Sequence, residues 1–289
     1  MRDKANRLLK TQLMGATCPD PVRAHRRHVL RSSGEIRKYV KKLLAAVTVP
    51  MPRVAVAHKR EYEPLAFGFV VLLITLAGFW PTFYGALAGE GNDLLHMLHG
   101  VSATLWIVLF LVQSWFTGYT KPRLHQWLGW SSVAVASVLI PSSLAMVHLM
   151  FAQALSPLFL VLGFIDLTSL PLFLGLYVAA LVYRRWPPIH WRLMASTLVV
   201  GVIPAAARFF RHLMHHSFPN LGDALLPSYL LVYCMLLVTI LFDWRKGRLL
   251  WPFPFTLTYC AVTQLTMVAG GHSIEFFYVA RSFANWRLR

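Results

Sequence analysis

The feature that most constrains this chain is a series of seven apolar stretches, each long enough to cross a membrane as a helix. About 20 apolar residues in a helix span a hydrocarbon core of roughly 30 Å. We expect spans near Leu65–Phe83, Leu94–Phe116, Leu128–Met150, Pro157–Tyr183, Leu193–His212, Leu225–Phe242 and Leu250–Ala269. The last is the weakest because Pro252 and Pro254 fall near its start. The sequence therefore predicts an all-α fold, a polytopic transmembrane helix bundle over residues 61–270.

The charge composition agrees with a membrane bundle that is preceded by a basic segment. Only 13% of the 289 residues are charged and 57% are hydrophobic, whereas a soluble domain carries about 25% charged residues. More than half of the 28 Lys and Arg residues lie in residues 1–61. The net charge of +17 is therefore mainly a property of that segment, and we expect no nucleic-acid binding from it.

Residues 1–60 read as a basic N-terminal segment whose structure the sequence leaves open. Ser33–Val47 has apolar residues on one face and lysines towards the other, which is typical of a helix that lies on anionic lipids. A disordered basic tail is an equal alternative. A third is that translation begins at Met51, which would remove the segment.

The loops predict the orientation of the chain in the membrane. Every second connection is basic, while the connections at 85–93 and 151–156 contain no Lys or Arg. The basic connections carry Lys121 and Arg123, then Arg184, Arg185 and Arg192, then Arg245, Lys246 and Arg248. By the positive-inside rule the N-terminus is cytoplasmic and residues 271–289 form a short extracytoplasmic tail. We expect a multi-pass protein of the cell inner membrane.

Histidines concentrate at the outer ends of the predicted spans. These are His96, His99, His148, His212, His215, His216 and His272. Neutral imidazole binds transition metals and haem iron. One hypothesis is therefore a haem-b site with a redox role, drawing on His96, His99, His148, His212 and Arg208. The metal alternative uses His96, His99, His212, His215 and His216. The plain alternative is that these histidines are amphipathic residues at headgroup level.

Two charged residues fall deep inside predicted spans, and a buried charge in a membrane is costly. Asp166 is the only acid at such depth and Arg208 is the only cation. They are interpreted as a structural ion pair or as residues that support the ligands of a cofactor. A second hypothesis is a transporter or carrier in which Asp166, Arg208 and Gln113 line a polar path. A third is a non-catalytic assembly or scaffold protein.

Several short motifs between about residues 61 and 215 carry a family resemblance. They are Gly78-Phe-Trp-Pro-Thr-Phe-Tyr, His96-Met-Leu-His-Gly, His125-Gln-Trp-Leu-Gly-Trp, His190-Trp-Arg-Leu-Met-Ala and Pro204-Ala-Ala-Ala-Arg-Phe. The chain resembles a group of uncharacterised bacterial multi-pass inner-membrane proteins with no established activity. The resemblance implies a bacterial membrane protein and marks His96, His99, His125, His190 and Arg208 as motif positions. The placement of histidines at helix ends is also similar to that of b-type membrane cytochromes.

Overall fold

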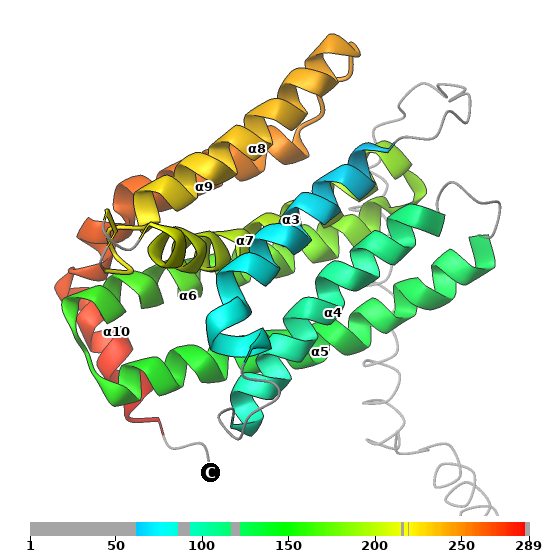
Figure 1. The fold of residues 1–289 in the computed structure, drawn as a ribbon. Helices are drawn as coiled ribbons and strands as arrows, with labels where there is room; N and C mark the ends of the chain where they lie inside the picture. Colours follow the sequence, from blue (N-terminus) through cyan, green and yellow to red (C-terminus); the bar gives the residue numbers. More distant parts are fainter. Residues whose placement is uncertain (1–61, 86–92, 117–121, 215–216, 219, 287–289) are drawn as a thin grey trace, which may run out of the picture. The chain divides into compact units, whose positions relative to one another are not determined.

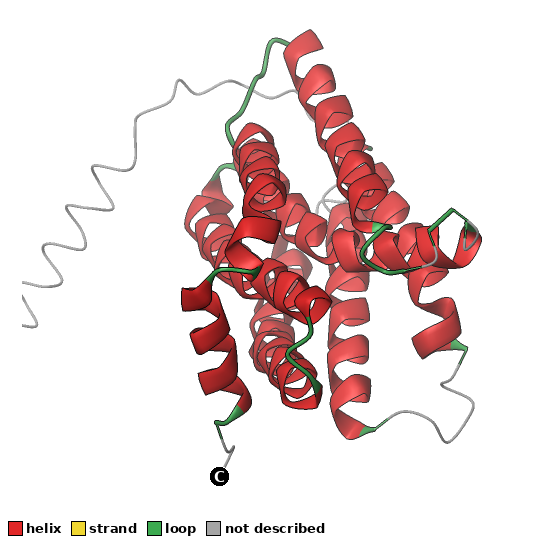
Figure 2. Ribbon diagram, turned by 90° about the vertical axis from the view of Figure 1, so that its left-hand side faces the viewer, coloured by secondary structure: helices red, strands yellow, loops and turns green. Residues whose placement is uncertain are grey.

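The computed structural model describes residues 62–85, 93–116, 122–214, 217–218 and 220–286, so the basic N-terminal segment lies outside the described residues. The described part is helical and contains no strand (Figures 1 and 2). Its elements are α3 (Glu63–Phe79), the π-helical turn η1 (Trp80–Tyr84), α4 (Leu94–Phe116), α5 (Pro122–Gln153), α6 (Pro157–Val182), the 3-10 turn η2 (Tyr183–Arg185), α7 (Pro187–Leu213), α8 (Leu225–Arg245), α9 (Pro252–Gly271) and α10 (Ile274–Ala284).

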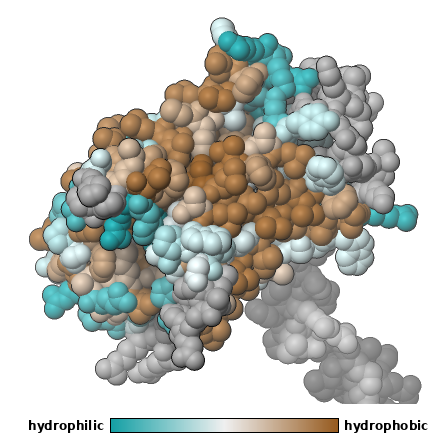
Figure 3. Space-filling view, viewed as in Figure 1, coloured by the Kyte–Doolittle hydropathy of each residue, from teal (hydrophilic) through white to brown (hydrophobic). Residues whose placement is uncertain are grey.

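Six described segments are long and apolar enough to cross a membrane. They are Glu63–Tyr84, Leu94–Phe116, Arg123–Gln153, Pro157–Arg185, Pro187–Leu213 and Leu225–Arg245. The face of the molecule in Figure 3 carries a broad apolar surface over α3 and its neighbours, as lipid contact requires. These observations support the predicted multi-pass membrane character. Helix α9 occupies the seventh apolar stretch and is not among these six segments.

Helix α7 is the centre of the bundle and packs against α3, α4, α6, α8 and α9. Small side chains permit this packing, because Ala205, Ala206 and Ala207 are fully buried on α7. Helix α3 approaches at Gly78, where a Cβ atom would lie only 2.1 Å from the backbone oxygen of Ala205. Close helix contact through small residues is a common way to join helices in membranes, where water does not drive association.

Several helices extend beyond the apolar stretches that predicted them. Helix α5 begins at Pro122, α7 begins at Pro187 and α8 continues to Arg245. His125, His190 and Arg192 therefore lie in helices, and for Arg192 this corrects its assignment to a basic connection between spans. The physical reason is that hydropathy marks only the apolar core of a span, whereas proline is favourable at the first position of a helix and lets α5 and α7 begin before that core.

The C-terminal region contains a helix where the sequence analysis expected only a tail. The Ser273 hydroxyl accepts a hydrogen bond from the Phe276 backbone N–H and so caps the start of α10. The buried Ala280 faces an apolar cluster with Val147, Phe151 and Leu160. Helix α10 thus packs against the ends of α5 and α6.

Candidate functional site

The structure gives the outer histidines separate environments. His99 on α4 is half-buried, and its Nδ1 atom lies 3.5 Å from the Ser142 hydroxyl and 3.4 Å from the Ser143 hydroxyl of α5. His148 on α5 faces α10, where its Nδ1 lies 2.9 Å from the Phe283 backbone oxygen. His212 and His272 are exposed. His99 and His148 thus have partners on different elements of the bundle.

His96 belongs to a local contact at the start of α4. Its Nδ1 lies 2.5 Å from the Asp93 carboxylate, and its backbone N–H donates to the same oxygen at 2.9 Å. These hydrogen bonds, the backbone one first, lower the pKa of the exposed Asp93 carboxyl. Asp93 therefore caps the helix in the usual manner of an acidic residue. His96 thus has Asp93 as its partner at the start of α4, whereas His99 faces the serines of α5.

A metal site of several ligands is not formed by the described residues, since no three His, Cys, Asp or Glu side chains among them are placed to hold one ion. His215 and His216, two members of the predicted metal set, lie outside the described residues. The haem and metal hypotheses therefore stay predictions.

Arg208 occupies the most unusual position in the bundle. It is carried by α7 inside a candidate span and is half-buried. Its guanidinium carbon lies 4.7 Å from the centre of the Phe79 ring, and Nη1 donates to the Pro204 backbone oxygen at 3.1 Å. Neither contact neutralises the charge. Ion pairs within the described residues join His96 to Asp93, Arg192 to Asp243 and Lys246 to Glu63, and Arg208 takes part in none of them.

Asp166 on α6 lies within electrostatic range of Arg208 but is not joined to it by a salt bridge. The charge of Arg208 also acts on the His99 ring. One cation from α7 thus influences a carboxyl group from α6 and an imidazole from α4. We call Arg208, Phe79, Asp166 and His99 the Arg208 site.

The backbone of α3 changes form beside this site. Helix α3 ends at Phe79, and the chain continues through the π-helical turn η1. The Tyr84 hydroxyl then lies 2.8 Å from the Thr104 hydroxyl of α4. Single π-turns often occur at functional positions because they redirect a side chain within a helix. Here the change of form occurs at the residue whose ring contacts Arg208.

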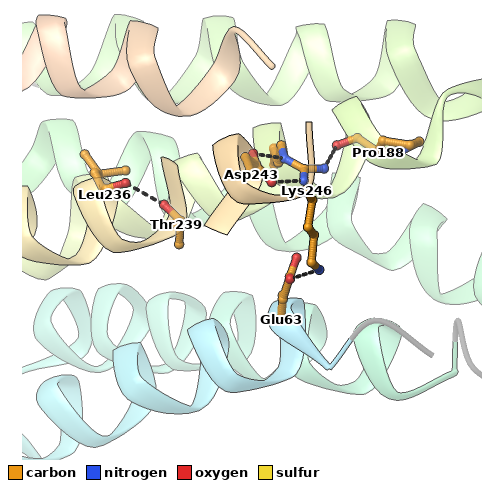
Figure 4. Close-up of polar contacts among 7 residues, drawn as sticks. Glu63, Pro188, Leu236, Thr239, Asp243 and Lys246 are labelled. Atoms are coloured by element: carbon orange, nitrogen blue, oxygen red, sulfur yellow. Dashed lines mark hydrogen bonds and ion pairs between the residues drawn. The ribbon is translucent and has the colours of Figure 1, made fainter. Parts of the chain in front are cut away.

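A second charged cluster, missed by the sequence analysis, lies at the opposite end of α7. Arg192 is 1% exposed and Asp243 on α8 is 2% exposed. Arg192 donates to both carboxylate oxygens of Asp243, with Nε at 2.6 Å, and to the Pro188 backbone oxygen at 2.5 Å (Figure 4). We call Arg192, Asp243 and Pro188 the Arg192 network. The network joins α7 to α8, because the charge of Arg192 is paired with that of Asp243.

The sequence signal for this network was present but ambiguous. Both Arg192 and Asp243 border an apolar stretch, and such charges commonly face headgroups. Only the packing of α7 on α8 buries them together. Nearby, Lys246 reaches from α8 to Glu63 at the start of α3 in a partly exposed ion pair (Figure 4).

The Arg208 site has the chemistry of an anion-binding position. A guanidinium presents five N–H donors in a planar fork that matches carboxylate and phosphate oxygens. The Pro204 carbonyl accepts a hydrogen bond from one of these donors, which leaves other N–H groups of the guanidinium for a ligand. We compared the chain with known protein families and structures. No family model matches it, and no curated protein or solved structure matches it either.

Proposed function

We propose that the protein is a membrane carrier for a small anion of the carboxylate or phosphate class, which binds at Arg208. The observation that carries this proposal is an arginine inside a candidate span that forms no ion pair with any described residue. An uncompensated charge in a membrane interior is costly. A bound anion would form an ion pair with the Arg208 guanidinium and would offset this cost.

The surroundings of Arg208 suit such a site. Phe79 holds the guanidinium through a cation–π contact and the Pro204 carbonyl fixes one donor. Both contacts orient the side chain and neither competes for the ligand as a carboxylate would. An oriented guanidinium loses less conformational freedom when it binds, so this support favours affinity.

Asp166 gives the carrier a means of coupling the anion to a proton. A deprotonated carboxylate near Arg208 competes with the incoming anion, whereas a protonated one does not. We infer that Asp166 takes up a proton when the anion binds, so that both enter the site together. The half-buried His99 on α4 is the second titratable group of the Arg208 site.

The membrane topology of the proposal includes α9 as a seventh span. Helix α9 has no charged residue and packs against α6, α7 and α8. With seven spans and cytoplasmic basic loops, the N-terminus is cytoplasmic and the C-terminus is outside. The Arg208 site then lies in the outer half of an inner membrane, and the basic N-terminal segment meets anionic lipids.

The test is binding and uptake by the full chain in proteoliposomes. The probes are inorganic phosphate, sulfate, acetate and succinate, each added with a pH gradient. Arg208→Gln is expected to weaken binding of the preferred probe by at least about tenfold, because a hydrogen bond to a charged group contributes about 1.5–3 kcal/mol. The matched control is Arg211→Gln on the same helix, because Arg211 is exposed and its loss should leave uptake unchanged.

Two results would contradict the carrier. One is equal uptake by the wild type and by Arg208→Gln. The other is a reduced-minus-oxidised visible spectrum with b-type bands that disappear in His99→Ala, which would establish the haem prediction in its place. An assembly or scaffold role, the remaining alternative, predicts no uptake of any probe and a spectrum without bands.

A further inference from the structure

Two motif histidines that the carrier does not use meet at the end of the bundle that holds the Arg192 network. His125 lies near the start of α5 and His190 near the start of α7. Their ring centroids are 6.4 Å apart and the rings are nearly perpendicular, at 80°. The two residues come from helices that otherwise make little contact, so the ring pair is a link between distant parts of the bundle.

The tautomer of His190 is set by its neighbour. Its Nδ1 atom lies 2.8 Å from the Ala180 backbone oxygen at the end of α6. A carbonyl oxygen only accepts, so Nδ1 carries the hydrogen and donates it. In a neutral ring the lone pair is then on Nε2. Histidines that bind metals have this arrangement, with one nitrogen donating to a carbonyl and the other free for the ion.

His125 has the complementary feature. Its Nδ1 atom is buried and forms no hydrogen bond with any described residue. A buried polar nitrogen without a partner is rare and calls for an explanation, such as a bound water or ion. Arg192, the nearest cation along α7 from His190, is already engaged by Asp243 and so does not oppose a metal ion as a free charge would.

The ring separation matches two ligands on one ion. With a nitrogen–metal distance of about 2.0–2.1 Å, each ring centroid lies roughly 3.2 Å from the metal. Two imidazoles on one ion are therefore roughly 5.2 Å apart in a tetrahedral site and roughly 6.4 Å apart when they are trans to one another, so the observed 6.4 Å lies at the upper end of the range for a shared ion. An edge-to-face contact between two rings has a similar separation, so the buried Nδ1 of His125, without a partner among the described residues, is the observation that favours an ion.

We propose that His125 and His190 together bind one divalent transition-metal ion, zinc or copper, which links α5 to α7. Imidazole suits both metals. No third His, Cys, Asp or Glu among the described residues joins the pair, so water ligands complete the coordination. The site is separate from Arg208, and its existence does not depend on the carrier function.

The test measures metal binding by the full chain in detergent. Zinc affinity and stoichiometry are compared for the wild type, His125→Ala, His190→Ala and the double variant. Each single variant should lose one zinc equivalent, or at least tenfold in affinity at that site, and the double variant should lose no more. The matched control replaces His212, His215 and His216 with Ala, and it should keep this zinc equivalent.

A second measurement separates lost ligation from lost folding. Electron paramagnetic resonance of bound Cu²⁺ should show coupling to two ring nitrogens in the wild type and to one in His125→Ala. His190→Gln keeps a donor for the Ala180 carbonyl and should fold normally without the site. Unchanged zinc affinity in both single variants, or copper coupled to the same nitrogens in all of them, would overturn the proposal.

Discussion

Arg192 and Arg208 lie on the same helix, α7, but they differ in burial and in ion pairing. Arg192 is fully buried and donates to both oxygens of a buried carboxylate. Arg208 is half-buried and rests on an aromatic ring, with its nearest carboxyl group outside salt-bridge distance. A paired, buried charge fixes helices together, whereas an oriented charge without an ion pair is available to a ligand. We interpret the paired charge of Arg192 as structural, and the charge of Arg208 as the anion-binding position that we propose.

The largest expected effect lies in the Arg192 network. Asp243→Ala leaves the Arg192 guanidinium buried without its partner, and we expect a loss of about 3–5 kcal/mol in the free energy of unfolding. The measurement is denaturant unfolding in detergent. Lys246→Ala is the control, because the partly exposed pair with Glu63 should contribute only about 0–1 kcal/mol. If the two variants lost equal free energy of unfolding, the buried Arg192–Asp243 pair would contribute no more than the partly exposed Lys246–Glu63 pair.

The next effect concerns the stability contributed by Arg208. Arg208→Gln removes one hydrogen bond to a backbone carbonyl and one cation–π contact, so we expect a loss of about 2 kcal/mol or less. The same unfolding experiment applies. A loss as large as that of Asp243→Ala would show that Arg208 is a structural residue, and the comparison on which the carrier rests would fail.

Phe79 offers a smaller and sharper test of how Arg208 is oriented. Phe79→Leu keeps an apolar side chain but removes the ring face, and an exposed cation–π contact contributes about 0.5–1 kcal/mol. We therefore expect roughly a two- to fivefold weaker binding of the preferred anion. Phe83→Leu is the control, because Phe83 packs against Tyr84 and Gly100 and not against the guanidinium. If Phe83→Leu weakened anion binding more than Phe79→Leu, the assignment of Phe79 as the residue that orients Arg208 would be wrong.

The smallest effect on stability is expected at the exposed pair of Asp93 and His96. Hydrogen bonds from His96 lower the pKa of Asp93. The stabilisation is therefore present above the ordinary carboxyl pKa and is lost as pH falls through the lower folded value. Carboxyl NMR titration should place the Asp93 pKa below that of an unstructured Asp. In His96→Ala the pKa should rise only in part, because the backbone bond remains; a complete return would show that the ring is the main cause.

Much of the architecture follows from patterns that act locally. Apolar stretches of membrane-spanning length predicted the long helices, and the structure confirms the helical, multi-pass character. The ends of the helices were less predictable, as at Arg192 and His190. Hydropathy reports where side chains meet lipid, and it falls to neutral values before the backbone leaves the helix.

Arg208, Asp166 and His99 were predictable as members of the candidate site, whereas Phe79 and the contacts between the members were not. A single charge deep in an apolar stretch is visible in a sequence, so Arg208 and Asp166 were found. His96 and His99 share one face of a helix, but the structure directs His96 to Asp93 and His99 to the serines of α5. Spacing along one helix does not determine which neighbouring helix each face meets.

The sequence by itself determined the class of the protein, the approximate helices and the rare charges inside them, because each follows from the transfer of side chains between water and lipid. Tertiary structure decided which charges are paired, since pairing depends on how helices pack. Arg192 finds Asp243 only because α7 lies on α8, and Arg208 lacks such a partner only because α6 places Asp166 beyond contact. Burial depends on the packing of the whole bundle, and burial determines how much each charge contributes to stability.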